Sequence, residues 1–267
     1  MIEPLNLVAM EQLGEPDPTA ISKHDLLSAM AFDRSGQILS VGDRGGRVIC
    51  FQAQRNDQGV EEFDYLTEFQ SHTKSFDVLS SHEISETVTA IEWINSSHSA
   101  QPAMLTSNSR QVKLFRLHNK QVRRAESIKK KMAKGKGLCL PKTKLVSEQK
   151  EAKHVYTFKT GKEHRLHSLS LSPDTENFIS ADENRINLWN LECSNERSVY
   201  NLVDYNRQRA LDEDEIITSS RFSDHSSVFS YTTSKGHIRI CDLRESSNFH
   251  SRPSIEFNLK QRKSTSG

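Results

Sequence analysis

Short runs in which apolar and polar residues alternate recur along the chain, separated by turns rich in Gly, Asp, Asn and Ser. Alternation with a period of two is typical of β-strands that bury one face. Four windows share a layout of strand, polar turn, strand, tight turn and strand: Leu26 to Gln52, Thr87 to His118, Arg165 to Glu192 and Ile216 to Ser246. Because no helical pattern lies between the strands, we predict an all-β protein built from repeats.

The spacing inside each window is nearly constant. From the last apolar residue of the first strand to the apolar residue in the middle of the third, it is 18 to 22 residues: Phe32 to Phe51, Trp93 to Phe115, Leu171 to Trp189 and Phe222 to Cys241. A β-propeller blade has four strands, so further strands are expected at 65–72, 154–164 and 198–205. A β-sandwich shows the same alternation without a reason for this spacing, and it stays the alternative.

The composition favours a folded protein that makes no contact with membranes. Apolar residues make up 34% of the chain and charged residues 27%, and the mean hydropathy is −0.66. No stretch approaches the ~20 consecutive apolar residues that a spanning helix needs. The first four residues, Met1 to Pro4, lack the basic and apolar regions of a secretory signal. The four widely spaced cysteines (Cys50, Cys139, Cys193 and Cys241) indicate a reducing compartment, and we expect a cytoplasmic location.

The net charge of +1 conceals a basic segment in an acidic chain. Residues 119–153 hold twelve Lys or Arg and three Glu, a net charge of +9, whereas the remainder holds 24 basic and 32 acidic residues, a net charge of −8. Nucleic-acid binding by the acidic body is therefore disfavoured. We interpret 119–153 as a solvated loop inserted between repeats. Nuclear import, an acidic partner or RNA are the alternatives for this segment.

Motifs for catalysis are missing from the sequence. GDRGG at 42–46 looks like a metallophosphatase loop, but the Asp-x-His and Asn-His partners that hold its two metals do not occur. A hairpin turn is the preferred interpretation of these residues. No nucleotide-binding loop, GxSxG or HExxH is present. His154, His164 and His167 are interpreted as turn histidines, so we predict no enzyme, no cofactor and no metal site.

Several longer segments are specific to one family. They are GDRGGRVICFQ (42–52), FQSH followed by FD (69–77), SADENRINLW (180–189), YNLVD (200–204) and TTSKGHIRICD (232–242). In this order they resemble the 55 kDa B-type regulatory subunit of protein phosphatase 2A, over about 26–118 and 154–246. The N-terminal extension 1–25, the basic insertion 119–153 and the low-complexity tail 247–267 lie outside the resemblance.

The resemblance implies a seven-bladed WD-repeat β-propeller, of which this sequence holds about four blades. An arc of four blades leaves sheet faces uncovered. We therefore expect either a piece of a longer chain or a partner that covers the arc. The resemblance also implies a regulatory subunit without catalysis, which docks on the phosphatase scaffold subunit and recruits phosphoprotein substrates to the catalytic subunit.

A hairpin between the first two blades is the scaffold-docking element that the resemblance implies. Its matching residues are Phe76, Asp77, Leu79, Glu83 and Glu86. Phe76 and Leu79 would be apolar anchors, and the glutamates a charged rim. The alternative is an ordinary loop between blades with one packed Phe.

The same resemblance implies a substrate groove lined by acidic residues. Asp182 and Glu183 match it directly, and Leu211 precedes the EIIT strand in a shifted register. The alternative for Asp182 is a β-turn cap, a common role of Asp. A function from another class also stays open: a WD-repeat scaffold that binds no phosphatase and contacts RNA or acidic partners through 119–153.

Overall fold

The structure is a computed structural model that describes residues 21–55, 61–77, 82–94, 101–125, 143–160, 165–192, 199–205, 215–224, 227–244 and 253–258. Across these residues it consists of β-strands and one short 3-10 turn, η1 (Lys23–Asp25), so the all-β prediction is confirmed. The described part contains no helix long and apolar enough to span a membrane.

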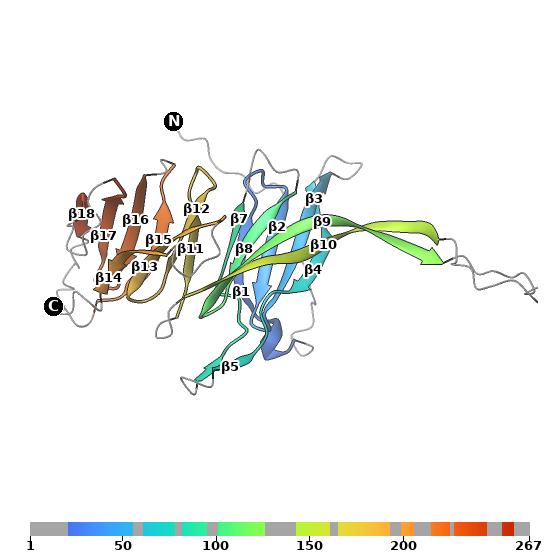
Figure 1. Cartoon of the computed structure of the whole chain (residues 1–267), viewed down its shortest axis with the longest axis horizontal. Helices are drawn as coiled ribbons and strands as arrows, with labels where there is room; N and C mark the ends of the chain where they lie inside the picture. The colour runs from blue at the N-terminus through green and yellow to red at the C-terminus, as the bar shows by residue number, and fades with distance from the viewer. Residues whose placement is uncertain are drawn as a thin grey trace, which may run out of the picture.

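Four antiparallel sheets of four strands each follow one another along the chain (Figure 1). The first holds β1 (Leu27–Phe32), β2 (Ile38–Asp43), β3 (Arg47–Arg55) and β4 (Glu61–Gln70), and the second β7 (Ala90–Ile94), β8 (Ala103–Ser107), β9 (Gln111–Ala125) and β10 (Thr143–Lys159). The third holds β11 (Ser168–Leu171), β12 (Asn177–Ala181), β13 (Arg185–Asn190) and β14 (Tyr200–Asp204), and the fourth β15 (Ile217–Phe222), β16 (Val228–Thr233), β17 (His237–Asp242) and β18 (Ile255–Asn258). A small hairpin of β5 (Ser75–Asp77) and β6 (His82–Ile84) lies between the first two sheets.

The first strands of the sheets form the inside of an arc. β1 lies beside β7, β7 beside β11, and β11 beside β15. Within each sheet the strands pair in chain order, so the fourth strand lies at the other edge. Four-stranded antiparallel sheets arranged in this way are the blades of a propeller. The predicted fold, four blades of a WD-repeat β-propeller, is confirmed.

In three of the four blades, the fourth strand lies in the segment that the sequence predicts for it. β4, β10 and β14 overlap 65–72, 154–164 and 198–205. In the last blade, β18 lies inside 247–267, the segment interpreted as a low-complexity tail. Ile255 and Phe257 of β18 pair with Ile240 and Ile238 of β17. The short alternation I-E-F-N was the only local signal for this strand.

The basic insertion is the element that differs most from expectation. β9 and β10 continue through residues 119–125 and 143–153 as a paired two-stranded ribbon, with Thr143 opposite Ala125. The interpretation of these residues as a loop is wrong. Figure 1 shows the ribbon extending well beyond the sheets. Pairing between β9 and β10 satisfies the backbone N–H and C=O groups of the ribbon without burying side chains. These strands therefore form without an alternation of apolar and polar residues in the sequence.

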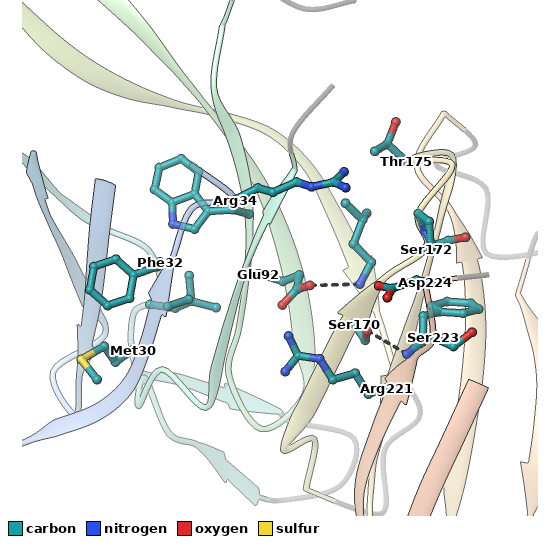
Figure 2. A pocket seen from close by; sticks show the side chains of 16 residues that line it. Met30, Phe32, Arg34, Glu92, Ser170, Ser172, Thr175, Arg221, Ser223 and Asp224 are labelled. Atoms are coloured by element: carbon teal, nitrogen blue, oxygen red, sulfur yellow. Dashed lines mark hydrogen bonds between the residues drawn. The ribbon is translucent and has the colours of Figure 1, made fainter. Parts of the chain in front are cut away.

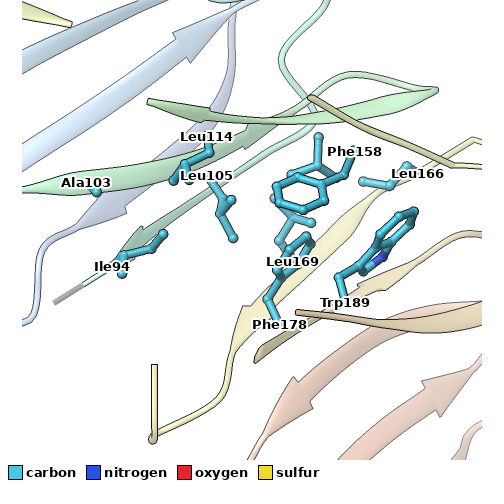
Figure 3. Close-up of a cluster of buried hydrophobic side chains, with 10 residues drawn as sticks. Ile94, Ala103, Leu105, Leu114, Phe158, Leu166, Leu169, Phe178 and Trp189 are labelled. Atoms are coloured by element: carbon cyan, nitrogen blue, oxygen red, sulfur yellow. The ribbon is translucent and has the colours of Figure 1, made fainter. Parts of the chain in front are cut away.

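Three hydrophobic clusters fill the spaces between adjacent blades. The cluster between the second and third blades packs Phe158 edge-on against Phe178 and Trp189, with ring centroids 5.0 and 5.8 Å apart (Figure 3). Trp189 also donates its indole N–H to Ser180 Oγ at 2.8 Å. The other two clusters are centred on Met104 and Phe115, and on Ile186 and Phe229. The apolar residues at the alternating strand positions therefore make the contacts between neighbouring blades.

Candidate functional site

The connections that lead from one sheet to the next share one end of the sheets. There, the chain that enters a sheet is hydrogen-bonded to the tight turn between the second and third strands of the sheet before it. These bonds run from Thr87 Oγ1 to the Arg44 carbonyl at 3.3 Å, from the Leu166 N–H to the Ser109 carbonyl at 3.0 Å, and from the Ile217 N–H to the Glu183 carbonyl at 2.8 Å. We call this end the linker face, and the other end the opposite face.

Asp182 caps one of the tight turns of the linker face. Its Oδ1 accepts hydrogen bonds from the N–H groups of Asn184 at 2.8 Å and Arg185 at 2.7 Å, and the residue is only 6% exposed. In the first blade, Asp43 Oδ1 accepts from the Arg47 N–H at 2.9 Å in the same way. The carboxylate of Asp182 is therefore occupied by the turn. Its neighbour Glu183 is half-buried.

The hairpin between the first two blades, which the resemblance implies, is present in the structure. Phe76 pairs with Glu83 across β5 and β6, and Asp77 pairs with His82. The Phe76 side chain is 62% exposed. Glu83 forms an ion pair with Lys74 at 2.6 Å, and both side chains are largely in solvent. Leu79 lies outside the described residues.

The base of this hairpin is tied to both neighbouring sheets. Glu86 is the inner of the two predicted rim acids, since its side chain is 16% exposed and lies 3.5 Å from His24 Nδ1. The carbonyl of Ser85 accepts from Asn108 Nδ2 at 3.1 Å. Gly46 adopts a φ of +81°, and a Cβ there would lie 2.2 Å from the His72 carbonyl. The first and second blades therefore hold the hairpin in a fixed place on the linker face.

A buried histidine beneath the hairpin escaped the sequence analysis. His72 follows β4 and is completely buried, with its Nδ1 2.9 Å from Ser71 Oγ. Ser71 Oγ in turn lies 2.6 Å from Thr106 Oγ1 of the second blade. Burial, with a smaller contribution from the Lys113 charge, lowers the pKa of His72 to about 3. The neutral imidazole is thus part of the packing between blades.

The segment from Leu211 to the EIIT strand, which the resemblance places at the substrate groove, carries four acids (Asp212, Glu213, Asp214 and Glu215) and is described only from residue 215 onward. Leu211 lies outside the described residues. Glu215, the last acid of the stretch, is 8% exposed at its side chain and lies 2.9 Å from His237 Nδ1 and 3.5 Å from Arg239 Nη1. Arg239 also contacts Tyr205 Oη, and burial raises the pKa of that phenol. Glu215, two residues before β15, is therefore an internal ion-pair partner, and no local sequence signal indicates this role.

The two described histidines among those interpreted as turn residues lie in different blades. His154, on β10 opposite Phe115, has its Nε2 2.9 Å from Thr157 Oγ1, whereas His167 lies at the start of the third blade. His164 lies outside the described residues. In the described ranges, no three His, Cys, Asp or Glu side chains gather closely enough to hold a metal ion. Cys50 is buried beside Ser40 Oγ, at 3.1 Å, and burial raises the pKa of its thiol to about 11.

The ribbon carries the basic charge into solvent. Its described outer part, 119–125 and 143–153, holds six Lys or Arg and two Glu, and most of these side chains are exposed. Lys120 and Glu151 form an ion pair at 2.5 Å across the two strands. At its base, the Lys150 carbonyl accepts from Thr67 Oγ1 of β4 at 2.8 Å. The ribbon is thus anchored to the first blade and basic beyond it.

Blades joined through their inner strands, of which the first three have an Asx-capped turn and a linker at the same end, define a WD-repeat β-propeller protein. No family model matches the chain. The chain is 33% identical over 241 residues to the gamma isoform of the 55 kDa regulatory B-type component of serine/threonine-protein phosphatase 2A from Mus musculus and from Homo sapiens. It is 34% identical over 233 residues to the same isoform from Macaca fascicularis. The family resemblance is confirmed: the chain is a homologue of the 55 kDa B-type regulatory subunits of protein phosphatase 2A.

The alignment with these relatives covers most of this chain and part of theirs. It includes 85% of this chain and 53% of the mouse and human proteins, and 82% and 51% for the Macaca protein. The chain spans about half the length of the curated relatives it matches.

Proposed function

We propose that the chain is a non-catalytic regulatory subunit of protein phosphatase 2A, which docks on the scaffold subunit and brings phosphoprotein substrates to the catalytic subunit. The observation that carries the proposal is the 33% identity, over 85% of the chain, to proteins named as regulatory subunits of this phosphatase. The proposed site of action is the cytoplasm.

The hairpin of β5 and β6 is the proposed scaffold-docking element. Phe76 is an aromatic side chain that is 62% exposed on an element held by two blades. Exposed aromatic residues on fixed elements are typical anchors of protein interfaces. Leu79 is proposed as the second anchor and Asp77, Glu83 and Glu86 as the polar surround, with Glu83 the exposed acid of the two glutamates.

The turn at 182–184 is the proposed start of the substrate surface, continuing toward Leu211. Because Asp182 accepts two turn N–H groups, Glu183 is proposed as the acid that contacts substrate, and Asp182 as the residue that positions it. An acidic surface at this place would attract basic segments of phosphoproteins through charge steering.

The assembly test uses the purified chain and the scaffold–catalytic heterodimer of the phosphatase, analysed by gel filtration with light scattering. We expect a 1:1:1 complex, and we expect Phe76→Ala to weaken it by at least about tenfold, as loss of an interface anchor does. Tyr200→Ala is the matched control, because Tyr200 is also an exposed aromatic residue (68%) but lies on the third blade. No complex from a folded chain, or equal effects of both variants, would contradict the docking proposal.

The second candidate function is a WD-repeat scaffold that contacts RNA or acidic partners through the basic ribbon. The observation that favours it is the exposed basic charge on the paired strands β9 and β10, since Lys and Arg side chains in solvent can bind phosphates. RNA binding through this charge should weaken steeply between low and physiological salt, whereas docking through Phe76 should not. Phosphatase activity of the isolated chain that is lost in Asp43→Asn would overturn both candidates.

A further inference from the structure

A cavity of about 590 Å³ opens where the four inner strands end, near the opposite face (Figure 2). Each blade contributes to its wall through residues of its inner strand, β1, β7, β11 or β15, and three of them also through the segment that follows this strand. These segments lie at the other end of the sheets from the turn at 182–184. The cavity is therefore separate from the proposed docking and substrate surfaces on the linker face.

At the edge of an inner strand, backbone N–H groups donate to side chains of the inner strand of the preceding blade. Glu92 Oε1 of β7 accepts from the Leu171 N–H of β11 at 3.3 Å, and Ser170 Oγ of β11 accepts from the Phe222 N–H of β15 at 3.0 Å. Arg221 occupies the corresponding position of β15, directly before the last apolar residue of its strand. A guanidinium cannot accept a hydrogen bond, so at this position the repeat supplies a donor to the cavity.

Two more donors in the cavity wall are buried without a partner. Trp93 is 5% exposed and Ser172 is 1% exposed, and both line the cavity. Neither the indole Nε1 of Trp93 nor the hydroxyl of Ser172 has a hydrogen-bond partner among the described residues. A buried N–H or O–H group without an acceptor costs about 1–3 kcal/mol. Both groups therefore favour a ligand that brings acceptor oxygens.

The charged groups of the wall are two arginines and two acids. Figure 2 shows Arg34 and Arg221 on either side of Glu92. No ion pair joins either arginine to another residue of the described chain, and both are exposed at the mouth. Burial raises the pKa of Glu92, and the hydrogen bond from the Leu171 N–H and the Arg221 charge oppose this rise. Asp224, the other acid of the wall, is exposed.

We propose that this cavity binds an oxyanion, a phosphate or a carboxylate, between Arg34 and Arg221, with the Trp93 indole and the Ser172 hydroxyl as further donors. Guanidinium groups bind both anions through charge-assisted hydrogen bonds, and phosphate offers more acceptor oxygens for the two neutral donors. The site is independent of phosphatase docking, since it uses residues of the inner strands and first turns only.

Titration followed by tryptophan fluorescence tests the site directly. The chain has two tryptophans, and Trp189 is hydrogen-bonded to Ser180 within the third blade, so a change on ligand addition reports on Trp93. The probes are inorganic phosphate and acetate, each against chloride at equal ionic strength. We expect a saturable change with phosphate, acetate or both, which identifies the source of the oxyanion, and no change in Trp93→Phe.

Charge variants of opposite sign separate a specific site from general attraction. Arg221→Gln should weaken binding about tenfold, the loss of one charge-assisted hydrogen bond. Glu92→Gln should tighten it, because the amide oxygen still accepts from Leu171 while the competing negative charge is gone. Arg244→Gln, an exposed arginine outside the cavity, is the control. Absence of saturation with both anions, the same change in chloride, or equal weakening by Arg221→Gln and Arg244→Gln would overturn the proposal.

Discussion

The hydroxyl of Ser168 on β11 bridges to the backbone of Ser220 on β15. It donates to the Ser220 carbonyl at 2.9 Å and accepts from the Ser220 N–H at 3.1 Å. Both residues are buried, at 9% and 3% exposure. Two residues further along each strand, Ser170 Oγ accepts from the Phe222 N–H. Between the inner strands of the third and fourth blades, serine hydroxyls therefore make the hydrogen bonds to the backbone that a neighbouring strand would make in a continuous sheet.

Ser168→Ala should destabilise the chain by about 1–3 kcal/mol, because it leaves both backbone groups of Ser220 buried without a partner. The midpoint of urea unfolding measures this change. Ser219→Ala is the control, since Ser219 lies on the exposed side of the same strand. Equal midpoints for Ser168→Ala and the unmodified chain would show that water satisfies Ser220 instead.

The chain should lose stability as the pH falls below about 6.5, the ordinary pKa of histidine in an unfolded chain. Because the folded-state pKa of His72 is lowered to about 3, the unfolded state binds the proton first. The stability held above pH 6.5 is lost progressively down to pH 3, and the loss at pH 5 amounts to about 2 kcal/mol from this residue. Denaturant unfolding at pH 7 and pH 5 measures it. His72→Gln should flatten the difference, and an unchanged pH dependence in that variant would assign it to other groups.

Gly46→Ala should be far more damaging than Gly36→Ala. Both glycines have positive φ, +81° and +72°, so both substitutions carry the strain of about 1 kcal/mol for a left-handed alanine. At Gly46 the new Cβ would also meet two backbone carbonyls, of His72 and Glu86, whereas at Gly36 nothing lies within 4 Å. We expect Gly46→Ala alone to displace the hairpin of β5 and β6. Thermal melts and scaffold binding of both variants check this, and equal melting temperatures would refute it.

Arg239→Met should destabilise the fourth blade, because it leaves Glu215 buried without its cation. We expect a loss of about 2–3 kcal/mol, below the ~3–5 kcal/mol of a fully buried pair, because the Arg239 side chain keeps 16% exposure. Arg244→Met removes an ion pair with Asp242 that faces solvent, so the melting temperature should stay the same. If the two variants melt alike, the cluster around Glu215 contributes no stability.

Much of the blade architecture could be predicted from local pattern. The alternation around Phe178 and Trp189 predicts β12 and β13, and a β-turn cap, one of the two roles open to Asp182, is the geometry that it has. The resemblance implies the hairpin at Phe76. The ribbon has no such signal, because β9 and β10 beyond residue 118 pair through the backbone while both of their faces are exposed. The burial of Glu215 has no local signal either, because a charged side chain suggests solvent exposure, whereas its partner Arg239 lies 24 residues later in sequence and 3.5 Å away in space.

Most strands, the tight turns and the repeat follow from local sequence, since period-two alternation and turn residues act over a few neighbours. Which side chains meet between blades depends on the packing of the whole chain. Ser168 and Ser220 are 52 residues apart, and Arg34 and Arg221 line one cavity although they come from the first and last blades. Such contacts depend on how the sheets pack around a common axis, and no local pattern encodes that packing because each blade is specified by its own residues.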